Sequence, residues 1–246
     1  MPTREDVQQL AHRLHSLSGG PELRRKAAAR LLARLHPTDA TETVQHLLDL
    51  SRTGWEPARC VLDSFVSALG MEAAQIPYAH ALRRLASVQQ LPKVATLFPE
   101  DAAPTMQMDE DAAARNDAKL FTESLGHLKT KARLTRDPDE MARLAAASNA
   151  SVVRNLLQNP RITEAVVVRI AARRPARPEP LLEIWRTPKW FARHEVKRAL
   201  VFNPYLPPEV GAKIVPLLSQ SDWRELVATR GVHPALREQA RLLLEV

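Results

Sequence analysis

The sequence predicts an all-α protein whose C-terminal half is an α-solenoid of stacked helix-turn-helix repeats. Two observations predict this fold. Apolar residues recur at helical spacing along nearly the whole chain, as in Val61, Leu62, Phe65, Val66 and Leu69, while strand-like alternation is missing. In addition, a segment ending in Asn-Pro occurs twice, at positions 159 and 203. We expect about twelve to fourteen helices and no sheet.

The composition favours helices and disfavours nucleotide-binding α/β folds. The 246 residues include only seven glycines, and glycine supplies the tight phosphate-binding turns of those folds. Aromatic residues make up 4% of the chain, whereas Ala, Leu and Arg are abundant. With 45% hydrophobic and 26% charged residues, the chain can bury a sizeable core in one long domain or two.

The sequence shows no sign of secretion or membrane insertion. Its single cysteine, Cys60, cannot form an internal disulfide and is most simply a small core residue, with a catalytic thiol as the alternative. Charges near the start replace the apolar core of a signal peptide. No charge-free stretch is longer than ten residues, whereas a bilayer span needs about 20 apolar residues. We therefore expect a cytoplasmic protein with no membrane partner.

Breaks in the helical pattern organise the first part of the chain. They fall at residues 18–21, 36–37, 53–54, 70 and 76–77, which gives about five helices in residues 3–96. Pro21 suits the first turn of the helix that follows it. We assign residues 1–97 to an N-terminal helical domain, which is either a separate bundle or a part of the same array.

Residues 98–115 interrupt the pattern with two prolines and five acidic residues, and we interpret them as an acidic linker or exposed loop. Two roles are open. The segment is either a solvated connector or an acidic arm that competes for a basic surface in the C-terminal half. The charge distribution motivates the second role: residues 1–115 contain 13 basic and 14 acidic residues (net −1), and residues 116–246 contain 22 and 14 (net +8).

Residues 116–246 form the predicted C-terminal helical-repeat domain. A helix is expected at about 117–134. After it, Asp137-Pro138-Asp139-Glu140 predicts a new helix, with Asp137 as the N-cap, Pro138 at the first helical position and Glu140 placed to accept from the N–H of the N-cap residue. The segment 154–162 then reappears as 198–206, each followed by Val and Ile four residues apart. A weaker third copy aligns residues 144–157 with 227–240.

The Asn-Pro step predicts the end of one helix and the start of the next. A residue before proline is driven out of the α region, and Asn tolerates the left-handed conformation that ends helices. The second helix would begin at residues 163–164 or 207–209. Because each helix pair leaves an apolar face uncovered, neighbouring pairs must stack, and we expect a curved solenoid.

This recurring segment, with its Asn-Pro step and the spaced Val and Ile that follow, resembles the bacterial HEAT-like and leucine-rich-repeat-variant helical repeats. The resemblance covers roughly residues 137–246. It implies a scaffold that binds a partner. Residues 1–97 have similar helix lengths but no clear copy of the motif.

The most distinctive local feature is residues 173–198, which combine Arg and Lys with the aromatic residues Trp185, Trp190 and Phe191. Basic side chains neutralise phosphates, and interleaved aromatic rings can stack on bases. Alternatively, the aromatic residues seal the core, as we expect for at least two of them, and the Arg residues coat an exposed face. The candidate residues for binding a partner or nucleic acid are Arg173, Arg174, Arg177, Arg186, Lys189, Trp190, Arg193, Lys197 and Arg198.

No catalytic or metal-binding signature occurs in the sequence, so we predict no catalytic residues, no metal and no cofactor. The eight histidines form neither a His-Glu-x-x-His motif nor a Cys/His cluster, and the His12 and His15 pair has no carboxylate in register. A remote relationship to HEAT-like DNA-repair glycosylases would need Glu183 near Trp185, or Asp222, as the acid. Asp222 fits a helix N-terminus better.

We therefore predict a non-enzymatic protein–protein interaction scaffold that is monomeric and binds an acidic segment of another protein. The alternative is a nucleic-acid-binding HEAT-like protein whose concave basic face holds duplex DNA. The excess of Arg over Lys, 27 to 8, does not separate the two, because a genome biased toward Arg codons gives the same ratio.

Overall fold

The computed structural model describes residues 2–17 and 19–245, without the side chains of residues 119 and 120. Within these residues it contains seventeen α-helices and three short 3-10 helices, and no strand. The all-α fold class is therefore confirmed. The expected number of helices was too low, because one-turn helices such as α6 (Pro92–Ala95) and α13 (Pro188–Phe191) lack a recognisable apolar period.

The chain forms two compact units, each described here by itself. Unit 1 contains Met1–Ala102, Pro208–Ala228 and Pro234–Val246, and unit 2 contains Ala103–Pro207 and Thr229–His233. The helices of unit 1 are α1 (Arg4–His15), α2 (Gly20–Arg34), α3 (Pro37–Arg52), α4 (Glu56–Met71), η1 (Ala73–Gln75), η2 (Ala79–Ala81), α5 (Leu82–Val88), α6, α15 (Pro208–Ile214), η3 (Val215–Leu217), α16 (Gln220–Ala228) and α17 (Pro234–Leu244).

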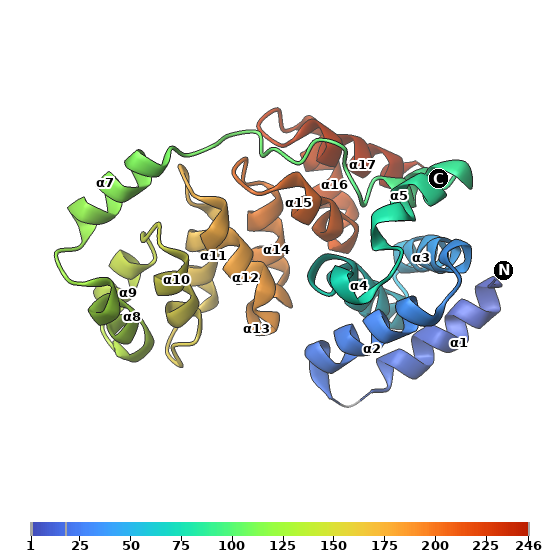
Figure 1. The fold of residues 1–246 in the computed structure, drawn as a ribbon, viewed down its shortest axis with the longest axis horizontal. Helices are drawn as coiled ribbons and strands as arrows, with labels where there is room; N and C mark the ends of the chain where they lie inside the picture. Colours follow the sequence, from blue (N-terminus) through green and yellow to red (C-terminus); the bar gives the residue numbers. More distant parts are fainter. Residues whose placement is uncertain (1, 18, 246) are drawn as a thin grey trace. The chain divides into compact units, whose positions relative to one another are not determined.

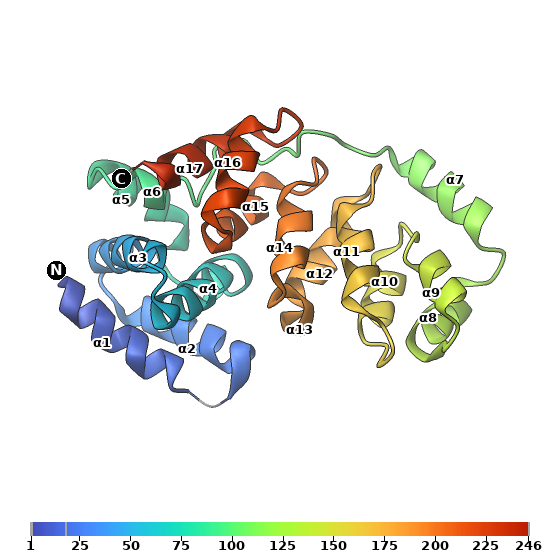
Figure 2. The same cartoon turned by 180° about the vertical axis from the view of Figure 1, so that it is seen from behind.

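Helix α4 is the centre of unit 1. Its predicted apolar face is buried, with Leu62 and Phe65 fully covered, and it packs against α1, α2 and α3 (Figure 2). Helix α15 also contacts α4, and α17 contacts α6. The C-terminal helices thus complete the core around the N-terminal ones, whereas the division made from the sequence grouped them with residues 116–207.

The helix start predicted at Asp137 agrees with the structure, but the expected return cap by Glu140 does not form. Asp137 is the N-cap of α9 (Pro138–Leu144), where its side chain accepts a hydrogen bond from the N–H of Asp139 at 3.0 Å. Glu140 does not cap in return. Its carboxylate instead pairs with Lys131 at 3.0 Å and with Arg143 at 2.9 Å, because these cations outcompete a backbone N–H for it.

The helices of unit 2 follow one another along the chain in a row of neighbours (Figure 1). Helix α10 packs against both α8 and α12, and α14 packs against α11. This row comprises α8 (Leu125–Leu134), α9, α10 (Ala150–Leu157), α11 (Glu164–Ala172), α12 (Pro178–Arg186), α13 and α14 (His194–Val201), and α7 (Glu110–Leu120) is set apart from it.

The first Asn-Pro turn is held by the Asn159 side chain, which is 1% exposed. Its Nδ2 donates to the carbonyl oxygens of Ala132 and Thr135, both at 3.0 Å, and its Oδ1 accepts from the N–H of Arg161 at 2.9 Å. Ala132 and Thr135 end helix α8, where carbonyl groups have no partner within the helix. The turn after α10 therefore caps the C-terminus of another helix.

The second Asn-Pro turn repeats this arrangement. Asn203, 2% exposed, donates from Nδ2 to the carbonyls of Ala171 at 2.7 Å and Arg173 at 2.9 Å, which end helix α11. Its Oδ1 accepts from the N–H of Tyr205 at 3.0 Å. Neither Asn has a positive φ, so the expected left-handed conformation was wrong. The position needs Asn for the hydrogen bonds of its side chain.

Residues 96–109 lie outside any helix, in agreement with the first part of the predicted linker. Helix α7 nevertheless begins at Glu110, after Asp109 caps it by accepting from the N–H of Ala112 at 3.3 Å. The helix expected at about 117–134 is in fact two, because Ser124 caps a new start at α8. Residues 110–115 are therefore helical, which corrects the linker interpretation for that part.

Candidate functional site

Helix α12 divides the predicted basic cluster into two groups. Arg177 is the residue just before the helix and Arg186 is its last residue. Nine residues at a rise of about 1.5 Å each separate the two ends by about 13 Å. We call Arg173, Arg174 and Arg177 the Arg173 patch, and we call Arg154, Arg186, Lys189 and Arg193 the Lys189 patch.

The Lys189 patch is organised around a buried carboxylate, Glu183. Nε and Nη2 of Arg154 each donate to one of its oxygens at 2.7 Å, and Nη1 of Arg186 lies 3.4 Å away. The hydrogen bonds from Arg154 are the main cause that lowers the pKa of Glu183, against the effect of burial. Both guanidinium groups are more than half exposed, so one carboxylate holds two outward-facing cations in place.

The remaining members of the Lys189 patch are also exposed. The Lys189 ammonium lies 4.4 Å from the centre of the Trp190 ring, and Arg193 lies 3.7 Å from Glu164. Trp190 itself is buried, and its Nε1 donates to the carbonyl of Leu157, the last residue of α10, at 2.9 Å. The indole is therefore a structural element that supports Lys189 from beneath.

The Arg173 patch is more strongly engaged by the protein. Arg177 pairs with Glu179 at 3.1 Å and with Glu110 of α7 at 3.5 Å. Burial lowers the pKa of the Arg173 guanidinium, and the charge of Asp117 acts in the opposite direction. Nη2 of Arg174 donates to the carbonyl of Phe202 at 2.5 Å.

Of the remaining candidate residues, Lys197 is buried and Arg198 is half-buried, and both remaining aromatic residues are buried. Lys197 is 8% exposed and lies 5.0 Å from the Phe191 ring, and Arg198 lies 4.8 Å from the Phe202 ring. Trp185 and Phe191 are buried like Trp190, so the expectation that most of these aromatic residues belong to the core is confirmed. Trp190 and Lys197 are not available as surface contacts.

The sequence did not identify Arg154, Glu110 or Asp117 as members of this site. Arg154 was visible only as part of the repeat, and its partner Glu183 lies 29 residues away. Glu110 and Asp117 are seven residues apart, a spacing that places two carboxylates on one helix face. That signal was present but fell across the expected end of the linker.

The carboxylates considered for a glycosylase-like reaction have structural partners. Glu183 accepts from Arg154 as described, and Asp222 accepts from the N–H of Ser219 at 2.9 Å at the start of α16. Ser219 Oγ in turn accepts from the N–H of Asp222 at 3.2 Å. This reciprocal pair is a capping box, as the helix N-terminal interpretation of Asp222 predicted.

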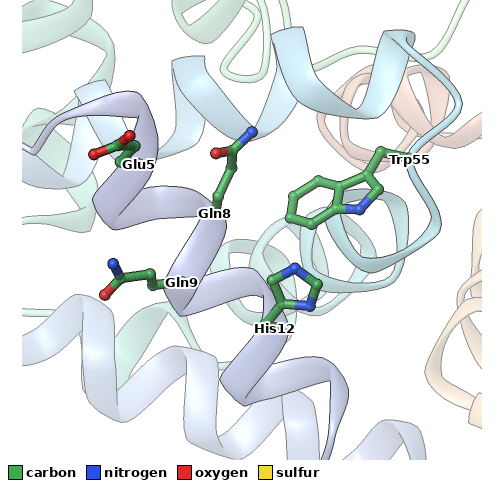
Figure 3. Close-up of a pocket in the computed structure, with 5 residues that line it drawn as sticks. All are labelled: Glu5, Gln8, Gln9, His12 and Trp55. Carbon is green, nitrogen blue, oxygen red and sulfur yellow. The ribbon is translucent and has the colours of Figure 1, made fainter.

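An open hollow of about 470 Å³ in unit 1 is lined by Glu5, Gln8, Gln9 and His12 of α1 and by Trp55 (Figure 3). His12 and Trp55 face each other edge to face, with ring centres 5.0 Å apart.

Cys60 is half-buried on α4 rather than fully inside the core.

Across residues 2–17 and 19–245, no group of three or more His, Cys, Asp or Glu side chains could hold a metal ion. No helix of the part that the structure describes is both long and apolar enough to cross a bilayer. Comparison of the chain with protein-family models, curated proteins and solved structures found no match.

Proposed function

We propose that the chain is a non-enzymatic, HEAT-like α-solenoid that acts as an interaction scaffold and binds an acidic segment of another protein. The repeated turn supports the repeat architecture: Asn159 and Asn203 each donate two hydrogen bonds to the end of a helix 24–32 residues earlier and accept one from the N–H two residues later. Helices tied in this way stack on near neighbours, which is how solenoids present extended binding surfaces.

The Lys189 patch is the proposed contact surface, and the observation that carries the proposal is the anchoring of Arg154 and Arg186 by Glu183. Because the buried carboxylate uses only part of each guanidinium, the other N–H groups remain for an incoming carboxylate. Their orientation is fixed before binding, so less side-chain entropy is lost when a partner binds. Lys189 adds a further exposed positive charge.

The same geometry favours an acidic protein over nucleic acid. Base stacking needs exposed aromatic rings, and Trp185, Trp190 and Phe191 are all buried. Phosphate binding needs several unneutralised cations along a groove, whereas Glu183 and Glu164 offset part of the charge of the Lys189 patch. Duplex DNA remains the second candidate and is one outcome of the test.

The test compares the wild type with the triple variant Arg186→Gln, Lys189→Gln and Arg193→Gln. Arg154 is kept, because its removal would leave Glu183 buried without its main partner. A fluorescent poly-glutamate peptide and a labelled DNA duplex are titrated by anisotropy at several salt concentrations. We expect the variant to bind the peptide at least about tenfold more weakly, and the wild type to bind DNA only weakly at physiological salt.

A matched control carries the same loss of three charges elsewhere in unit 2. Arg133, Arg136 and Arg169 are exposed residues outside both patches, and their replacement by Gln should leave peptide binding near the wild-type value. An equal loss in both triple variants would mean that net charge alone drives binding. Tight, salt-sensitive DNA binding that only the patch variant loses would favour the nucleic-acid function instead.

A further inference from the structure

Helix α7 reaches the Arg173 patch through Glu110 and the neighbouring loop before α10 through Asp117. Glu110 reaches Arg177 at 3.5 Å, and Oδ1 of Asp117 accepts from the N–H of Ser148, in the loop before α10, at 2.7 Å. The Asp117 charge also favours the charged form of Arg173. An acidic helix of the chain thus lies against Arg177 at the N-terminal end of α12 and places a second carboxylate on the nearby Ser148 N–H.

The contacting residues of α7 form one face. Glu110, Ala113 and Asp117 follow an i, i+3, i+7 spacing, which brings them onto one side of a helix within two turns. Ala113 is 3% exposed, so a small side chain lies at the point of closest packing, between the two carboxylates. The face that α7 turns to its neighbours thus consists of a carboxylate, a small residue and a second carboxylate.

The attachment of α7 is weak compared with that of the other helices in unit 2. Ala113 is its one buried side chain among those described, and the Glu110 side chain in the Arg177 pair is 86% exposed. Half-buried Asn116 adds hydrogen bonds to the Ala146 carbonyl at 3.4 Å and to Ser148 Oγ at 3.2 Å. Exposed ion pairs contribute little to stability. The segment before α7 is non-helical from residue 96 to 109, and the Met106 N–H in it donates to the Pro204 carbonyl at 3.0 Å. Helix α7 can therefore leave the surface without unfolding a neighbouring helix.

The receptor side is more rigid than the helix that covers it. Glu179 holds the Arg177 guanidinium through two oxygens at 3.1 Å, and Nη2, one of the two nitrogens so held, is also the atom that meets Glu110. The carbonyl of Arg173 accepts from the buried Asn203, which fixes the backbone of the loop that carries the patch. The Ser148 N–H belongs to the main chain, directly before Asn149, the N-cap of α10.

We propose that the Arg173 patch, with the Ser148 N–H, is a docking surface for acidic helices, that α7 covers it in the free protein, and that an acidic helix of a partner protein displaces α7. The partner helix would carry two carboxylates two turns apart with a small residue between them. This inference rests on the proposed function, since the partner is again acidic, but it assigns a different surface and a built-in competitor.

The experiment uses a fluorescent peptide of residues 107–121 as the probe and the full-length chain as the receptor. The wild type, whose own α7 covers the surface, should bind the peptide weakly. A chain with Glu110→Gln and Asp117→Ala should bind it at least about tenfold more tightly, because its own helix has lost both carboxylates. Adding Arg173→Gln and Arg177→Gln to that chain should abolish the gain.

Two controls test the specificity of the recognition. A chain with Asp111→Asn, which changes an exposed acid of α7 outside the contacting face, should behave as the wild type. A peptide of the same composition with its carboxylates moved off the two-turn spacing should bind the Glu110/Asp117 variant at least about tenfold more weakly. Equal binding of both peptides, or equal binding by the wild type and the Glu110/Asp117 variant, would overturn the proposal.

The result is separable from the test of the proposed function. The triple variant of the Lys189 patch should retain full binding of the α7 peptide in the Glu110/Asp117 background, because the two patches lie at opposite ends of α12. Loss of peptide binding there would overturn the assignment to the Arg173 patch. A wild-type dimer that the peptide dissociates would assign the surface to α7 of a second copy and overturn the assignment to a partner protein.

Discussion

At the scale of single residues, the buried polar side chains explain more of this structure than the exposed charges do. Asn159 and Asn203 satisfy helix-end carbonyls that would otherwise be buried without partners, and the Trp190 indole does the same for Leu157. Such groups contribute mainly through the cost of leaving their partners unsatisfied. Their replacement is therefore more damaging than their number of hydrogen bonds suggests.

We predict that Asn159→Ala or Asn203→Ala lowers the free energy of unfolding by about 3 kcal/mol, because two carbonyls and one N–H lose their partner at a buried site. Asn159→Asp should be as harmful, since a carboxylate cannot donate. Asn155→Ala is the matched control: this half-buried Asn donates only to Ser151 of its own helix, so a change within about 0.5 kcal/mol is expected. Urea denaturation measures all four, and equal losses in Asn155→Ala and Asn159→Ala would contradict the capping role.

Lys213 is a buried cation whose nearest polar partners are main-chain carbonyls. Its Nζ donates to Glu209 at 2.9 Å and Leu97 at 3.5 Å, and it lies 5.3 Å from the Phe98 ring. Burial lowers the pKa of Lys213 to about 8, with Glu209 acting weakly in the opposite direction. Because the unfolded chain binds this proton more tightly, stability is reduced at neutral pH and rises between pH 8 and 10.5.

Replacing Lys213 by Met should therefore raise the free energy of unfolding at pH 7, by up to about 3 kcal/mol for the full pKa difference. The rise in stability between pH 8 and 10.5 should flatten in the variant. Lys26→Met, at an exposed position of α2, removes the same charge and should keep the wild-type pH profile. A Lys213→Met protein that is less stable at pH 7 and keeps the alkaline rise would refute this account.

At the scale of helices, sequence patterns located most elements but not the residues that join them. The Asn-Pro steps, the Asp137 cap and the apolar face of α4 follow from local rules, because each depends on residues within a few positions. The partners of Asn159 lie 24 and 27 residues earlier, and Arg154 meets a carboxylate 29 residues later. No local sequence rule predicts contacts between residues so far apart along the chain. The basic residues of 173–198 therefore appeared to form one cluster, although α12 divides them into two patches.

The Arg154–Glu183 pair ties α10 to α12, and we predict that Arg154→Met costs about 2 kcal/mol at pH 7, since a buried carboxylate loses its closest partner. In the wild type the lowered pKa of Glu183 contributes stability that is present above its usual range and lost as the pH falls. In Arg154→Met the pH dependence should have the opposite sign, because the free energy of unfolding should fall as rising pH ionises the Glu183 carboxyl. The double variant Arg154→Met, Glu183→Gln should recover most of the loss in thermal denaturation, and no recovery would show that the charge is not the cause.

At the scale of the whole molecule, the main departure from the sequence-based picture is the composition of unit 1. Charge and repeat pattern separate residues 1–97 from 116–246, whereas packing places α15, α16 and α17 with the N-terminal helices. Ile214 of α15 is fully buried in this unit, and Gln239 of α17 donates to the Ala212 carbonyl at 2.8 Å. The distribution of surface charge does not determine which apolar faces pack together, so a domain boundary based on charge did not predict this arrangement.

Fragments of the chain test this composition directly. Residues 1–102 alone should fail to unfold cooperatively, because they lack α15, which packs on α4, and α17, which packs on α6. Joining residues 1–102 to 208–246 restores the missing helices. Because Lys213 contacts Leu97 and Phe98, a Gly/Ser linker of about ten residues should be long enough to connect residue 102 to residue 208. We expect the joined protein, but not residues 1–102, to show a single sharp transition by circular dichroism. Cooperative unfolding of residues 1–102 alone, with no gain on joining, would show that the N-terminal helices form a separate domain as the sequence indicated.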